Sequence, residues 1–138
     1  MLRYFAISLL ALSCISFAGE PKRYNKTDTF CEDAEELSTI TSQLPDYALS
    51  SKLDTSAGIV GQNKFRPFGV LSAARGQPVC IAIVVSELGV VQDAAAYFPK
   101  RVALSRLERK QLMTTKYKPA LQGGIPTKSI VLMKAWSD

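Results

Sequence analysis

The side chains that carry most enzyme chemistry are scarce or scattered in this sequence. Its 138 residues include no histidine, which excludes Ser-His and Cys-His nucleophile pairs and the commonest nitrogen ligand of metals. The three cysteines, Cys14, Cys31 and Cys80, are too far apart for a CxxC motif or a zinc knuckle. Ser105 and Lys110 could supply a Ser-Lys pair, but Ser105 begins a helix-capping motif, which explains its position without catalysis. The sequence therefore predicts a protein that is not an enzyme and holds no metal or cofactor.

Four carboxylates gather near the start of the acidic part of the chain and could indicate a metal site or a pair of catalytic acids. They are Glu32, Asp33, Glu35 and Glu36. One short helix directs these side chains several ways, and the helix dipole favours acidic residues in a first turn. We therefore interpret the cluster as the solvated start of a helix.

Residues 1–18 have the features of a secretory signal peptide. A positive charge is followed by an apolar run, and Ser16 and Ala18 are the small residues that a signal peptidase reads. The run is shorter than the roughly 20 residues of a membrane-spanning helix. We expect export with cleavage after Ala18. Two alternatives stay open: an uncleaved anchor, and a lipoprotein acylated at Cys14, since the residues before it loosely resemble a lipobox.

Export changes how the remaining cysteines are interpreted. Removal of the signal peptide leaves Cys31 and Cys80, an even pair in an oxidising compartment. A bridge between them would close a loop of about 50 residues and restrain the unfolded chain by roughly 4 kcal/mol. We predict this disulfide; two buried thiols are the alternative.

Charge divides the exported chain in two. Residues 19–58 carry 4 Lys and Arg against 8 Asp and Glu, a net charge of −4, whereas residues 59–138 carry 12 against 4, a net charge of +8. A basic half can indicate nucleic-acid binding. Here the cations alternate with an apolar framework, no aromatic RNA-binding motif accompanies them, and export separates the protein from nucleic acid. We therefore expect no nucleic-acid partner.

The acidic part begins with the signals of an amphipathic helix. Thr29 and Glu32 have the spacing of a capping box, and Pro45 follows the last apolar position. The mostly apolar stripe recurs at helical spacing through Phe30, Ala34, Leu37, Thr41 and Leu44. Residues 46–78 contain repeated glycine and proline, which predicts loops and short extended pieces.

Two strands are predicted after this loop region. Residues 79–85 form a continuous β-branched and apolar run, the pattern of a covered strand. Residues 86–89 predict a turn, and the extended pattern resumes through Phe98 before Pro99 ends it. Strands this close in sequence form an antiparallel hairpin.

A helix and a final strand complete the predicted fold. Ser105 and Glu108 are spaced as a second capping box, which begins a helix that extends to about Tyr117. Residues 123–126 predict a turn, and residues 129–136 a last strand. The expected fold class is α+β: a small antiparallel three-stranded sheet, in the order β-β-α-β, packed on a helix and preceded by the N-terminal amphipathic helix.

Three short motifs occur in order in the second half of the chain. Residues 75–79 (RGQPV) place a glycine before the first predicted strand. Residues 87–91 (ELGVV) contain the turn between the first and second predicted strands. Residues 116–120 (KYKPA) are followed by residues 123–126 (GGIP). Together they resemble the C-terminal domain of the TonB family, the periplasmic end of bacterial energy transducers. The resemblance covers about residues 75–136.

With the signal peptide at residues 1–18, the resemblance implies a division of the exported chain into an N-terminal helical and loop segment (19–68) and a TonB C-terminal-like domain (69–138). An energy transducer of this family also needs a membrane anchor and a Pro-rich arm. Here the signal is expected to be cleaved, and only about 50 residues without a Pro-rich run precede the domain. The resemblance thus implies a fold and a binding mode rather than energy transduction.

The binding mode implied by the resemblance is capture of a partner peptide at the last strand. An edge strand presents unpaired N–H and C=O groups, to which an extended peptide can add by β-augmentation. The implied partner is a peptide or strand of an envelope protein in the periplasm, such as a TonB-dependent outer-membrane receptor. The protein would then be accessory to outer-membrane transport. The implied partner-binding residues are Ile130, Val131, Leu132, Met133, Lys134 and Trp136.

Two alternatives use the same surface differently. The edge could pair with a second copy, which would make the protein a homodimer and a self-associating structural or assembly protein of the cell envelope. The acidic N-terminal helix could instead pack over the sheet, with Lys134 as a solvated residue that prevents aggregation.

Overall fold

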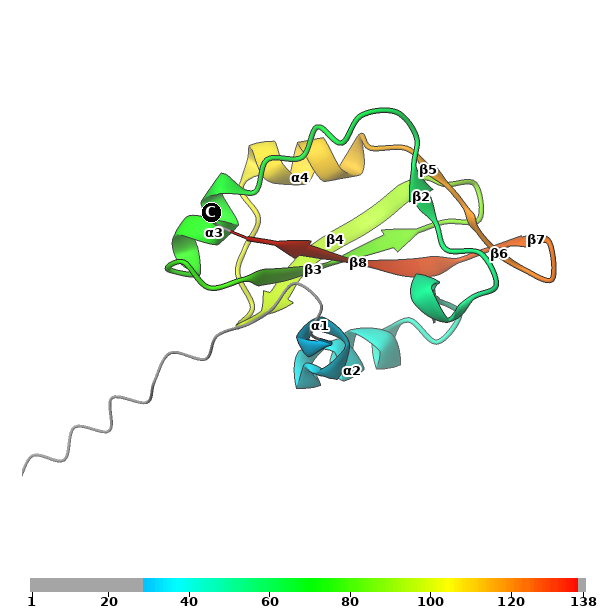
Figure 1. The fold of residues 1–138 in the computed structure, drawn as a ribbon, viewed down its shortest axis with the longest axis horizontal. Helices are drawn as coiled ribbons and strands as arrows, with labels where there is room; N and C mark the ends of the chain where they lie inside the picture. Colours follow the sequence, from blue (N-terminus) through cyan, green and yellow to red (C-terminus); the bar gives the residue numbers. More distant parts are fainter. Residues whose placement is uncertain (1–28, 137–138) are drawn as a thin grey trace, which may run out of the picture.

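The computed structural model describes residues 29–136 (Figure 1). The predicted signal peptide, residues 1–18, and the alternative acylation site Cys14 lie outside these residues. In chain order the elements are α1 (Phe30–Asp33), α2 (Glu35–Gln43), β1 (Ala48–Leu49), the 3-10 turn η1 (Ser50–Lys52), β2 (Gly58–Ile59), α3 (Phe68–Ala73), β3 (Val79–Val85), β4 (Val91–Phe98), α4 (Arg106–Met113), β5 (Tyr117–Lys118), β6 (Ala120–Gln122), β7 (Ile125–Thr127) and β8 (Ser129–Ala135).

β3 is the central strand, and both of its long sides are paired. It is antiparallel to β4 on one side and to β8 on the other, and its residues are buried throughout. β1 adds to the far side of β8 in parallel over two residue pairs, Ala48 with Ser129 and Leu49 with Ile130. Within the described residues the main sheet therefore has the order β1-β8-β3-β4, and two smaller sheets join β2 to β5 and β6 to β7.

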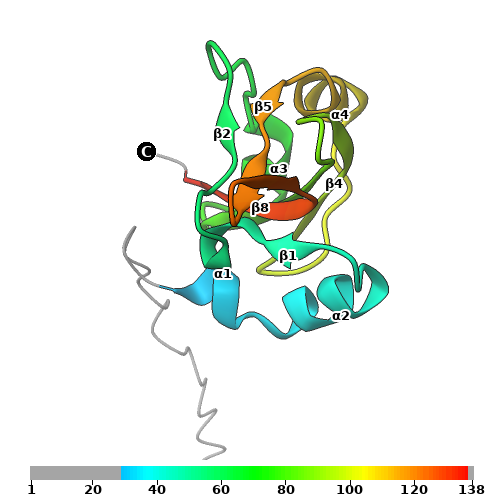
Figure 2. The ribbon, with the colours of Figure 1, turned by 90° about the vertical axis from the view of Figure 1, so that its right-hand side faces the viewer.

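Helices cover both faces of the main sheet. α3 and α4 pack on one face and α1 and α2 on the other, as Figures 1 and 2 show from two sides. The predicted three-stranded sheet packed on one helix is therefore wrong, because residues 29–136 form a mixed α/β fold whose main sheet has four strands. The prediction failed because the N-terminal segment packs on the second face of the sheet and brings β1 beside β8.

The side chains of β3 alternate between two hydrophobic cores. Ile81 and Ile83 contribute to the core formed with α3 and α4, whereas Cys80 and Ala82 contribute to the core formed with α1 and α2. A strand between two cores has no solvent-facing side, which explains the continuous apolar run in the sequence. The predicted bounds of this strand and its antiparallel hairpin with β4 are confirmed.

A disulfide joins α1 to the sheet. Cys31 and Cys80 are bonded, as predicted, with 5.7 Å between their Cα atoms. Beside this bond, the buried Tyr97 hydroxyl donates to the carbonyl oxygen of Cys31 at 2.8 Å. Burial, followed by the negative charges of Glu32 and Glu36, raises the pKa of Tyr97 above its ordinary value of 10.0. One covalent bond and one buried hydrogen bond thus fix the first helix to the sheet.

The N-terminal helix differs from its prediction in two respects. The backbone at Ala34 is extended, with φ −66° and ψ 134°, and it separates α1 from α2. The predicted capping box of Thr29 and Glu32 is wrong, because no backbone N–H of the described residues donates to the Thr29 side chain. The Thr29 hydroxyl instead donates to the carboxylate of Asp33 at 2.7 Å.

Glu108 fastens the starts of two helices together. It forms the predicted capping box with Ser105, in which each backbone N–H donates to the other residue's side chain. Glu108 Oε2 also accepts from the Val70 N–H in α3 at 3.2 Å. A Cβ at position 69 would lie 2.5 Å from Glu108 Oε1, so Gly69 allows the buried carboxylate to approach α3.

Short strands replace the predicted turn region after α4. The helix ends at Met113 rather than near Tyr117, because Tyr117 pairs with Ile59 of β2. Residues 123–126, predicted only as a turn, lie within the β6–β7 hairpin. The last strand, β8, ends at Ala135, one position before its predicted end.

Gly89 lies in the turn between β3 and β4, where the hairpin packs closely against β5. A substitution at this position tests that close packing. The φ of Gly89 is +79°, and a Cβ there would lie 1.9 Å from the carbonyl oxygen of Tyr117. Gly89→Ala is expected to lower the free energy of unfolding by about 3 kcal/mol, as measured by urea titration. Gly61→Ala is the matched control: Gly61 has φ +80°, no described atom lies within 4 Å of the added Cβ, and the loss should be about 1 kcal/mol. Equal losses would contradict the close contact.

Two buried tyrosines should make stability depend on alkaline pH. Burial raises the pKa of both Tyr97 and Tyr117 above 10.0, so the unfolded chain releases these protons at lower pH than the folded chain. Above about pH 10, the free energy of unfolding is expected to fall by up to about 1.4 kcal/mol per pH unit for each tyrosine. Tyr97→Phe should remove the Tyr97 share of this slope and cost about 1 kcal/mol at neutral pH. Urea unfolding over a pH series measures both effects, and an unchanged slope would argue against the Tyr97 contribution.

Candidate functional site

The main sheet has two sides whose backbone groups face away from β3. One is the outer side of β4, and the other is the outer side of β8, where β1 adds its short pairing. Strand edges present N–H and C=O groups that can pair with another chain. The two sides differ in how these groups are satisfied.

Side chains and a loop close the outer side of β4. The Ala94 N–H donates to the Asp93 carboxylate at 2.8 Å, and the Ala94 carbonyl accepts from Arg109 at 3.3 Å. Arg109 and Asp93 form an ion pair at 3.0 Å. Further along the strand, the Val102 N–H donates to the carbonyl of Ala96 at 3.3 Å. Charged side chains and partial pairing of this kind protect a sheet edge from other strands.

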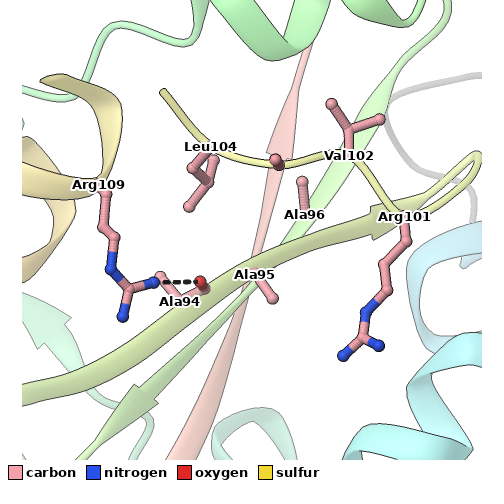
Figure 3. Close-up of a pocket in the computed structure, with 8 residues that line it drawn as sticks. Ala94, Ala95, Ala96, Arg101, Val102, Leu104 and Arg109 are labelled. Atoms are coloured by element: carbon pink, nitrogen blue, oxygen red, sulfur yellow. Dashed lines mark hydrogen bonds between the residues drawn. The ribbon is translucent and has the colours of Figure 1, made fainter. Parts of the chain in front are cut away.

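Figure 3 shows this side of β4 and the hollow beside it. Arg109 reaches the carbonyl of Ala94, and the segment with Val102 and Leu104 runs along the strand. The hollow has a volume of about 480 Å³, and its walls are mainly alanine, valine and leucine. Because Arg109 is already paired with Asp93, its charge is partly neutralised within the protein. We interpret this arrangement as a closed edge rather than a ligand site.

The outer side of β8 is covered for only part of its length. β1 pairs with Ser129 and Ile130, and the Ala48 N–H donates to the Lys128 carbonyl at 3.4 Å. The backbone groups of alternate residues point to the same side of a strand, so those of Ile130 and Leu132 also point away from β3. In the part of the chain that the structure describes, no strand pairs with this side beyond Ile130.

A groove of about 200 Å³ lies between β8 and the loop that follows β1. This loop continues from β1 through η1, which lies near β8, and is held by its own hydrogen bonds. The Ala57 N–H donates to the Ser50 hydroxyl at 2.7 Å, and the Ser56 hydroxyl donates to the Ser50 carbonyl at 3.2 Å. Space is therefore kept beside the part of β8 that β1 does not pair. The residues that line the groove are Glu32, Ser50, Ser51, Ser56, Ala57, Ile130, Val131 and Leu132.

The implied partner-binding residues point to both faces of β8. Val131 and Met133 pack against the core with α3 and α4, whereas Ile130 and Leu132 pack with α1 and α2. Ile130 is fully buried, and the other three are partly exposed. The side chains of β8 thus serve mainly the protein's own cores, and its backbone is the part directed toward the groove.

The end of β8 contacts α1. The Lys134 ammonium lies 5.1 Å from the centroid of the Phe30 ring, a cation–π distance. Trp136 meets the same ring edge-on, with 5.8 Å between ring centroids. The acidic helices α1 and α2 therefore lie on a face of the sheet, and α1 also lies beside the last residues of β8.

Sequence reasoning missed one wall of the groove. Ser50, Ser51, Ser56 and Ala57 belong to a segment without periodic pattern, and they reach β8 only because β1 pairs with it from a distant part of the chain. Glu32, predicted to lie at a solvated helix start, also lines the groove. No local signal in the sequence could have identified these residues, since their placement depends on a long-range pairing.

Known proteins offer no guide to this site. No protein-family model matches the chain, and neither does any curated protein or solved structure.

Among residues 29–136, no group of three or more His, Cys, Asp or Glu side chains is placed to hold a metal ion. In that same range, no helix is both long and apolar enough to cross a membrane.

The closure of β4 leads to a prediction about association. Asp93→Ala removes the acceptor of the Ala94 N–H and the partner of Arg109, which exposes backbone groups on the outer side of β4. Both charged side chains are at least half exposed, so the free energy of unfolding should fall by less than about 1 kcal/mol. Self-association should increase, and sedimentation velocity should give a higher average mass than for the wild type at equal concentration. Glu35→Ala, which removes an exposed carboxylate from α2, is the control and should leave the mass unchanged. An unchanged mass for Asp93→Ala would show that the ion pair does not protect the edge.

Proposed function

We propose that this chain is an exported protein–protein interaction module that captures an extended peptide by β-strand addition along the outer side of β8. The observation that carries the proposal is the difference between the two sides of the sheet. Asp93, Arg109 and Val102 pair with backbone groups of Ala94 and Ala96 on the outer side of β4, whereas β1 pairs with β8 only as far as Ile130. A peptide that continued the path of β1 would extend this pairing.

The surroundings of β8 suit a peptide backbone. Leu132 directs its N–H and C=O away from β3 and lines the groove beyond β1. Each backbone hydrogen bond contributes about 1 kcal/mol net, so selectivity must come from side chains beside the strand. Glu32 lines the groove, and Lys134 lies further along β8 beside Phe30. A docked peptide would therefore meet a negative and then a positive charge, which favours a complementary sequence.

The disulfide supports a location outside the cytosol. Disulfides persist in oxidising compartments and are rare in cytosolic proteins, and Cys31 is bonded to Cys80. We propose that residues 1–18 are removed as a signal peptide and that the protein works in the periplasm. A lipoprotein acylated at Cys14 is the alternative within the same compartment.

The proposed partner comes from the resemblance to the TonB C-terminal domain. That resemblance suggests a peptide or strand of an envelope protein, for example a TonB-dependent outer-membrane receptor. We propose a role accessory to transport rather than energy transduction, because residues 19–68 contain no Pro-rich run that could act as an extended arm. We propose no catalytic role, since the chain has no histidine and its Ser105 is a helix cap.

Proline at position 132 tests strand capture. Leu132→Pro removes the N–H that faces the groove and leaves the neighbouring residues 131 and 133 to pair with β3. The probe is a ten-residue peptide selected on the wild-type protein from a random display library. Its affinity, measured by fluorescence polarisation, should fall at least about tenfold, because the lost hydrogen bond and the proline ring both oppose pairing.

Leu132→Thr is the matched control, because it changes the side chain and keeps the N–H. Its peptide affinity should stay within about threefold of the wild type, and circular dichroism checks that both variants fold. If the proline variant does not fold, protection of the Leu132 amide from hydrogen exchange on peptide addition is the second measurement. Unchanged affinity in the proline variant, or an unprotected Leu132 amide, would rule out capture at β8. A stable dimer that no peptide dissociates would favour self-pairing instead.

A further inference from the structure

Three chain segments place one row of side chains on the surface next to the main sheet. The pairing of β2 with β5 continues to Val60, whose N–H donates to the Lys116 carbonyl at 2.9 Å. On its other side, Lys116 pairs with Val90. Directly paired residues project their side chains to the same face. Val60, Lys116 and Val90 therefore form a continuous row.

The apolar members of this row are exposed without serving a core. Val60 and Val90 are 49% and 54% exposed, and Leu88, in the turn before Val90, is 81% exposed. Ile59 and Tyr117, the next pair along β2 and β5, contact the core on the opposite face. Exposed apolar side chains that gather on one surface mark an interaction site.

Lysines accompany the apolar side chains. Lys116 lies within the row, and Lys118 lies two positions along, on the same face of β5. Lys64 lines a hollow of about 380 Å³ together with Val60 and Lys116. All three lysines are exposed, and none forms a salt bridge with a carboxylate of residues 29–136. Their positive charge is therefore available to an external anion.

Positive charge gathers on this surface, whereas negative charge gathers on α1 and α2. The segments 58–64, 86–90 and 110–118 together carry four lysines and one glutamate, Glu87. The acidic helices α1 and α2 lie on the opposite side of the main sheet from β2 and β5 in both views (Figures 1 and 2). An anionic surface would attract the β2–β5 side and repel the α1–α2 side, which favours one orientation of approach.

We propose that Val60, Leu88, Val90, Lys64, Lys116 and Lys118 form a docking surface for an anionic phospholipid bilayer. Leu88 and the two valines enter the interfacial region, and the lysines contact lipid phosphates while their aliphatic stems cover apolar surface. A bilayer suits this surface better than a peptide does, because the row of Val60, Lys116 and Val90 already has its backbone paired within the protein. Docking is independent of peptide capture, since β8 contributes none of these residues.

Vesicle sedimentation tests the proposal with the protein as isolated from the producing cell. The probes are vesicles of phosphatidylcholine alone and vesicles with an equal part of phosphatidylglycerol, at low ionic strength. Binding to the anionic vesicles should be at least about tenfold stronger, and added salt should weaken it. Lys116→Glu with Lys118→Glu, and separately Leu88→Ser, should each reduce it at least about fivefold. The altered side chains are exposed, so these variants are expected to fold.

Matched controls separate this surface from general charge and hydrophobicity. Lys100→Glu with Arg101→Glu reverses two exposed charges at the far end of β4, and Leu107→Ser removes a leucine of α4 that is 64% exposed. Both should bind anionic vesicles like the wild type. Absence of binding, equal binding to both vesicle types, or equal losses in the controls would overturn the proposal. Loss of binding to an acidic protein by the same variants, without vesicle binding, would assign the surface to a protein partner. Failure of the vesicle experiment leaves the Leu132→Pro test of peptide capture unaffected.

Discussion

The complete burial of β3 is the constraint on which the rest of the structure depends. Its residues face two cores in alternation, so neither face of the sheet can be left to solvent. α3 and α4 cover one face, and the N-terminal helices cover the other. The disulfide attaches that second cover at Cys80 of β3 itself. The acidic N-terminal segment is therefore part of the fold, although its composition differs strongly from that of the basic half.

Local sequence patterns identified the elements that depend on local physics. The apolar run of β3, the hairpin to β4 and the capping box of α4 each involve residues close in the chain, and the sequence located all three. The cysteine pair could be predicted because export leaves only one pairing. The strand count was wrong because β1 has only two residues and no periodicity, and its position depends on β8, which lies near the other end of the chain. The apolar run of β3 did indicate a strand that is covered on both faces. It did not indicate that α1 and α2 are the elements that cover the second face.

The candidate site likewise combines residues that local patterns identify with residues that only the tertiary structure brings together. The residues of the last strand could be named from the sequence, whereas the opposite wall of the groove could not, because Ser50 and Ala57 approach β8 only through the β1 pairing. The contrast between the two sheet edges also depends on the tertiary structure. Arg109 protects β4 because α4 places it beside Ala94, and no spacing in the sequence specifies that contact. The proposed lipid-facing row arises in a similar way, since it combines residues from three separate segments.

Glu108 affects how the layer formed by α3 and α4 unfolds. α3 has six residues and α4 has eight, lengths at which isolated helices are unstable in water. One buried carboxylate accepts hydrogen bonds from backbone N–H groups at the start of both helices. If either start frays, this buried carboxylate loses a hydrogen-bond partner, which also weakens its support of the other helix. We therefore expect the two helices to unfold as one unit and their amides to exchange together, although the residues that join them are far apart in the chain.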